Sequence, residues 1–167
     1  MGLYEGIKDV AKVIQQADNV EKKEYNDMFF VCSLIEYIGR KTKNHRNVVV
    51  NAVGKEKLQH IYNLADVYHS DNIDKITDEL IRDYHIEQGR FDNVADAQYS
   101  IPSHWDIGKV YKRLIVDVCN KQDKKPVETL IEVYNSWISR KIEDFNSSLY
   151  YESPDYLYES YVKGEVL

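Results

Sequence analysis

Arg40 and His45 are two side chains whose types and spacing could act together on a phosphate group. A histidine can donate or accept a proton near neutral pH, which would let His45 act as a general acid or base. The guanidinium of Arg40 could stabilise the negative charge of the phosphate. These residue types therefore permit a catalytic hypothesis in which Arg40 and His45 act together.

The Arg-x4-His spacing resembles the element of helical RNA-cleaving domains, and this implies an RNA-cleaving or RNA-binding domain as one alternative. A two-residue element also arises often by chance. Here it falls at the predicted end of a helix, inside a lysine-rich turn. The sequence therefore favours a solvated basic turn, and a protein that is not an enzyme.

The sequence predicts no metal site and no cofactor. His69 and Asp71 could bracket a metal ion, but two ligands on one turn are too few for a site. Ser70 between them cannot complete a catalytic triad, because adjacent residues in a turn do not supply its geometry. A glycine-rich phosphate loop and a paired cysteine motif are both missing from the sequence.

Charge is segregated along the chain. Residues 40–57 hold six Lys or Arg against one acid, whereas residues 62–96 hold nine acids against three bases. An acidic helical face would speed encounter with a basic partner, and Asp71, Asp74 and Asp78 are its candidate contacts. The four-residue spacing of Asp71 from Lys75 and of Asp78 from Arg82 is equally typical of a solvated helix surface.

Tyrosines are concentrated near the C-terminus, where five of the fourteen fall within twelve residues. Tyrosine combines a large contact area with a polar tip, and it is common in protein interfaces. Tyr156, Tyr158 and Tyr161 are therefore candidate contacts to a partner or to another copy. The alternative is that this segment packs back on the helical bundle.

Composition predicts a single cytoplasmic domain spanning residues 1–167. This length suffices for one core, and no run approaches the roughly 20 apolar residues of a membrane span. The first residues lack the uninterrupted apolar run of a signal peptide, and Cys32 and Cys119 both lie in apolar helical patterns that suit a reducing compartment. The net charge of −6 makes a nucleic-acid partner unfavourable.

Apolar residues at helical spacing predict an all-α bundle of about seven or eight helices, with a long connector near residues 87–104. We expect helices over residues 3–16, 26–43, 48–54, 55–68, 73–86, 103–118, 126–145 and 154–164, with a loop over 17–23. The predicted core includes Phe29, Phe30, Leu34, Ile38, Leu64, Leu80, Leu114, Ile115, Leu130 and Trp137.

The segments FVCSLIEYIGRKTK and LQHIYNLADVYHSDNIDKITDELI, within residues 29–82, resemble a small bacterial family of helical proteins. Genes of that family are often found beside ADP-ribosyltransferase-like toxins, so the resemblance implies an antitoxin or accessory role. We therefore expect a non-enzymatic protein–protein interaction module, such as an antitoxin or immunity protein of a bacterial or phage system. A structural homo-oligomer is a further alternative.

Overall fold

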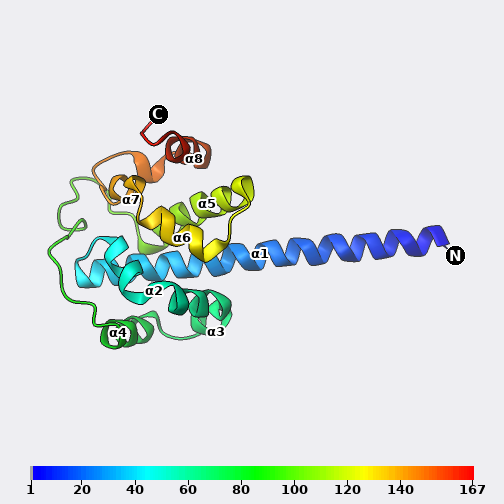
Figure 1. The fold of residues 1–167 in the computed structure, drawn as a ribbon, viewed down its shortest axis with the longest axis horizontal. Coiled ribbons are helices and arrows are strands. Elements are labelled where there is room, and N and C mark those ends of the chain that lie inside the picture. Colours follow the sequence, from blue (N-terminus) through cyan, green and yellow to red (C-terminus); the bar gives the residue numbers. More distant parts are fainter. Residues whose placement is uncertain (1) are drawn as a thin grey trace.

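One long helix, α1 (Gly2–Thr42), opens the chain (Figure 1). The structure is a computed structural model that describes the backbone of residues 2–167 and the side chains of residues 9–12 and 22–167. The prediction of two helices joined by a loop over 17–23 is wrong. That stretch is polar but contains no glycine or proline, and its alanine, glutamate and lysines favour helix, so nothing in it stops α1.

Seven further α-helices and one 3₁₀ helix follow, and the described residues contain no strand. The helices are α2 (Arg46–Asn63), α3 (Ala65–His69), α4 (Ile73–Asp83), α5 (His104–Gln122), α6 (Pro126–Tyr134), α7 (Trp137–Ile142), η1 (Leu149–Tyr151) and α8 (Pro154–Lys163). The second half of α1 packs against both α5 and α2, α6 packs against α2 and α5, and α3 and α4 lie against α1 (Figure 1). The all-α prediction is confirmed.

Helix starts and stops in the second half of the chain follow local sequence signals. Ser103 and Asp106 form a reciprocal capping box at the start of α5. Pro126 and Pro154 occupy the first turns of α6 and α8, where their missing N–H groups cost nothing. Gly164 ends α8 in a left-handed conformation with φ 86°.

Three further predicted helices are divided differently in the structure. The helix expected over 126–145 is interrupted after Tyr134, where the Asn135 side chain donates to the carbonyl of Ile131 and competes with helical hydrogen bonding. The helices expected over 48–54 and 55–68 instead form α2 and α3. Gly54, with φ 82° and ψ 165°, has a non-helical backbone and divides α2 into two helical stretches, which agrees with the predicted boundary after residue 54.

The predicted connector is confirmed as a segment without helices between α4 and α5. Backbone hydrogen bonds tie it to the end of α1. The Gly89 N–H donates to the Thr42 carbonyl and the Phe91 N–H to the Lys43 carbonyl, both at 2.8 Å. The connector thus covers the turn between α1 and α2.

The predicted core is mostly correct, since seven of its ten residues are buried. Leu64 is wrong, because it is 40% exposed at the junction where α2 ends and α3 begins. Phe29 and Trp137 are only half-buried. The break at Leu64 turns its side chain out of the stripe that a continuous helix would have buried.

Candidate functional site

Arg40 and His45 lie at the end of α1 and in the following turn, and each is held by a different buried carboxylate. The Nε of Arg40 donates to Oε2 of Glu36 at 2.8 Å, and an Nη donates to the Pro102 carbonyl. Nδ1 of His45 lies 2.7 Å from Oε2 of Glu143, and the imidazole stacks on Phe91 with ring centroids 3.9 Å apart.

Arg46, whose guanidinium is buried, connects these two carboxylates through its side chain and its backbone. Its Nε and Nη2 donate to Glu36 at 2.9 and 2.8 Å, and the Arg46 backbone N–H donates to Oε1 of Glu143 at 2.8 Å. Nη2 also donates to Oδ1 of Asn93, which is itself buried in the connector. We call Glu36, Arg40, His45, Arg46 and Glu143 the buried ion network.

The buried ion network has the charge balance and hydrogen bonding of a structural centre. Glu143 could orient His45 for proton transfer, as a carboxylate does in catalytic triads. Arg40, however, would have to face a phosphate, and it is already paired with Glu36. The RNA-cleaving alternative stays a prediction that this geometry does not favour.

Sequence reasoning missed Glu36, Arg46 and Glu143. One signal was available: Glu36 is a lone charge inside the apolar run from Phe29 to Ile38, and it is 1% exposed. A charge in such a run needs a buried partner. The sequence does not say which residue supplies it.

The stability of the fold should fall in acid because of Glu36. Burial raises the pKa of Glu36, but the charges and hydrogen bonds of Arg46 and Arg40 outweigh burial and hold it below the ordinary value. Because the pKa of Glu36 is lower in the folded state, the ionised carboxylate stabilises the fold at pH values above its unfolded pKa of about 4.3. This stabilisation is lost as the pH falls through the folded pKa. Urea midpoints should therefore drop between neutral pH and about pH 3. The drop in urea midpoint should be smaller in the double variant Glu36→Met, Arg46→Met. An equal drop in this variant and in the unmodified protein would show that Glu36 does not cause the acid sensitivity.

The acidic face of α4 partly serves to dock α4 on α1. Asp74 accepts a hydrogen bond from the Tyr37 hydroxyl, and Asp78 pairs with Lys41 at 2.7 Å. The expected pair of Asp78 with Arg82 is not among the described ion pairs, nor is that of Asp71 with Lys75. Arg82 pairs with Asp83 instead. Of the three predicted partner contacts on this face, Asp71 is the one that is exposed and does not dock α4 on α1.

The candidate contacts Tyr156, Tyr158 and Tyr161 pack against the helical core. The Tyr156 hydroxyl donates to the Leu167 carbonyl at 2.8 Å, and Lys121 lies 4.0 Å from the centroid of the Tyr158 ring. Burial, helped by the charge of Glu132, raises the pKa of Tyr161. These three tyrosines are half-buried, so only part of each side chain is exposed for contact with a partner. Their role as partner contacts stays a prediction.

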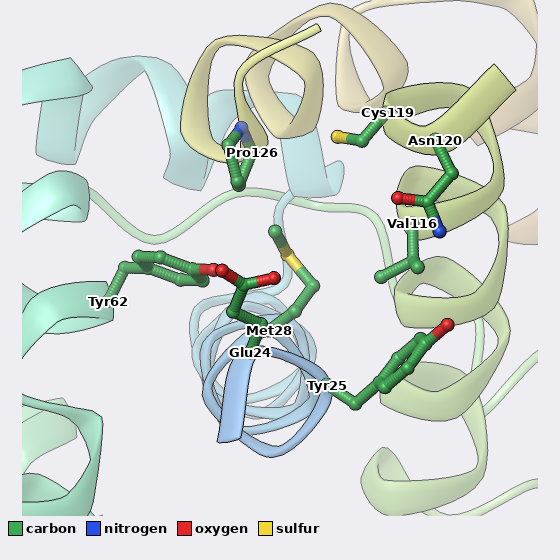
Figure 2. A pocket seen from close by; sticks show the side chains of 8 residues that line it. All are labelled: Glu24, Tyr25, Met28, Tyr62, Val116, Cys119, Asn120 and Pro126. Atoms are coloured by element: carbon green, nitrogen blue, oxygen red, sulfur yellow. The ribbon is translucent and has the colours of Figure 1, made fainter. Parts of the chain in front are cut away.

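A hollow of about 140 Å³ lies where α1 passes between α2, α5 and α6 (Figure 2). Figure 2 shows Tyr62 pointing from α2 towards Glu24 of α1, with Val116, Cys119 and Asn120 of α5 on the other side. Burial, together with the nearby charge of Glu24, raises the pKa of Tyr62 to about 12. The hollow is smaller than the roughly 300–1,000 Å³ of typical small-molecule sites.

Among the side chains that the structure describes, no three His, Cys, Asp or Glu residues gather as ligands for a metal ion. None of the described helices is long and apolar enough to cross a membrane. Comparisons with protein-family models, curated proteins and solved structures found no match to this chain.

Proposed function

We propose that this protein is a non-enzymatic interaction module that works as a dimer, joined through the first part of α1. We call residues 2–22 the arm. The observation that carries the proposal is the continuous helix α1, whose first half projects from the body as a single rod (Figure 1). The side chains described before Asp27 are exposed, and the buried part of α1 begins at that residue.

The spacing of apolar residues in the arm is typical of helices that pack along one another. Leu3, Ile7, Val10, Ile14 and Ala17 alternate at spacings of four and three, which places their positions on one side of a helix. Val10 is 59% exposed. Most of the stability of helices in proteins comes from packing of an apolar face, so packing of this stripe would stabilise the arm.

Charge and length support a second copy as the occupant of the stripe. Residues 2–22 carry three lysines and four acids, a net charge of −1, whereas the whole chain carries −6. Electrostatic repulsion between two arms is therefore small. A highly charged partner would likewise gain little electrostatic attraction from the arm. At 1.5 Å per residue the arm is about 30 Å long, enough for several turns of side-by-side packing.

Aspartates in the stripe should separate the dimer. We expect unmodified protein to show twice the 19.6 kDa chain mass by light scattering, and Ile7→Asp with Val10→Asp to show one chain mass. Gln15→Asp with Gln16→Asp is the matched control, because it adds the same charge to the same arm outside the stripe. A control that also dissociates, or an unmodified protein that is monomeric, would refute the dimer.

An inhibitory role, such as that of an antitoxin or immunity protein, is a narrower form of this proposal. The partial resemblance over residues 29–82 supports it. In that case the helical body, and not the arm, would contact the inhibited protein.

A further inference from the structure

A second hollow lies at the base of the arm, between α1 and α3. Its volume is about 360 Å³, within the range of sites that hold a ligand or an anchoring side chain. Asp27, Phe29 and Phe30 line it from α1, and Asp66 and His69 line it from α3. We call this the α1–α3 hollow.

Asp27 is a buried carboxylate with one oxygen unused. The residue is 4% exposed, and its Oδ2 accepts a hydrogen bond from Lys23 at 2.9 Å. Oδ1 has no hydrogen-bond partner among the side chains that the structure describes. Oδ1 is also closed to solvent, so a donor from outside the chain reaches it only when the Asp27 side chain turns. A buried acceptor without a donor is unfavourable, and this favours such a turn when a donor is present.

The local charge fits one additional cation. Nζ of Lys23 also lies 3.4 Å from Oδ2 of Asp66, so one ammonium serves two carboxylates. The three groups together carry a net charge of −1. Asp66 is 69% exposed in its side chain and stands where a ligand would enter.

The aromatic lining of the hollow favours a guanidinium over an ammonium group. The His69 ring meets the Phe30 ring edge to face, with centroids 5.8 Å apart. Phe29 also lines the hollow, and its ring lies 5.6 Å from that of Trp105. A guanidinium is planar and weakly hydrated, it stacks on aromatic faces, and it donates several hydrogen bonds in one plane. An ammonium has a tighter hydration shell and gains less from such a lining.

We propose that the α1–α3 hollow binds an arginine side chain of a protein partner, with a guanidinium N–H donating to the Asp27 carboxylate once this side chain turns Oδ1 towards the hollow. Asp71, exposed just beyond α3, extends the same negative surface and would attract a basic partner. The proposal rests on the proposed function only in taking the arginine from another protein, and it does not require the dimer.

Amide NMR signals of the full chain, titrated with the blocked peptide acetyl-Gly-Arg-Gly-amide, test this site. We expect shifts confined to residues 26–30 and 65–69, and none with the same peptide carrying neutral citrulline. Asp27→Asn should weaken binding at least about tenfold, the loss expected for one charge-assisted hydrogen bond. Glu159→Gln, an equal charge change at an exposed residue of α8 away from the hollow, should bind as the unmodified chain does.

Shifts spread over the acidic surface, equal binding of the citrulline peptide, or undiminished binding by Asp27→Asn would each overturn the proposal. If Asp27→Asn does not fold, Asp66→Asn replaces it, with a loss of up to about fivefold. No loss in that variant would also overturn the proposal. The mass of the same sample is measured alongside, so a monomer that binds the peptide refutes only the dimer. A dimer that ignores the peptide refutes only this site.

Discussion

Replacing Arg46 by methionine should lower the free energy of unfolding by about 3–5 kcal/mol, because it leaves Glu36 buried without its main partner. Arg40 keeps one contact with Glu36, but it cannot replace the two hydrogen bonds from Arg46. Urea unfolding followed by circular dichroism measures the loss. Lys55→Met is the control, since its pair with Glu128 is exposed and should cost less than about 1 kcal/mol.

The double variant Glu36→Met, Arg46→Met should recover much of this loss. Removing both members of a buried ion pair leaves no uncompensated charge, and the methionines can fill part of the space. A single variant within about 1 kcal/mol of the unmodified protein would show that the network does not stabilise the fold.

Gly108→Ala should lower the free energy of unfolding by about 1–3 kcal/mol through overpacking between α1 and α5. A Cβ at Gly108 would meet the Oγ of Ser33 and would lie only 2.8 Å from its backbone N and 2.9 Å from its Cα. Backbone atoms of α1 cannot move aside without separating the two helices.

Ser33→Ala separates the two causes of this clash. Alone it should be tolerated, because the buried Ser33 Oγ has no hydrogen-bond partner among the described side chains. Combined with Gly108→Ala it should rescue little, since the backbone contacts remain. A Gly108→Ala protein with an unchanged urea midpoint would contradict the close packing of α1 on α5.

Features governed by neighbouring residues could be predicted from the sequence. The Ser103 capping box and the stop at Gly164 depend on a few adjacent side chains and on glycine's access to positive φ. The loop over 17–23 was wrong because polar composition alone does not end a helix. Leu64 was wrong because a break one residue long changes which side of a helix is buried.

Features governed by distant residues could not be predicted. The spacing of Arg40 and His45 led to the correct polar region, but their partners include Glu143, far along the chain. Asp78 pairs with Lys41 of α1 although Arg82 stands at ideal helical spacing. In both cases the packing of separate helices determines the partner. The spacing of residues along one helix does not predict a partner on another.

Hydrogen–deuterium exchange of the arm at low and high protein concentration tests the dimer most directly. An arm packed on a second copy keeps its helical hydrogen bonds, so its amides should exchange more slowly as the dimer fills. We predict protection of residues 5–20 that rises with concentration and is lost in the variant carrying Ile7→Asp and Val10→Asp. Equally fast exchange of these amides at every concentration, beside a protected body, would contradict the account.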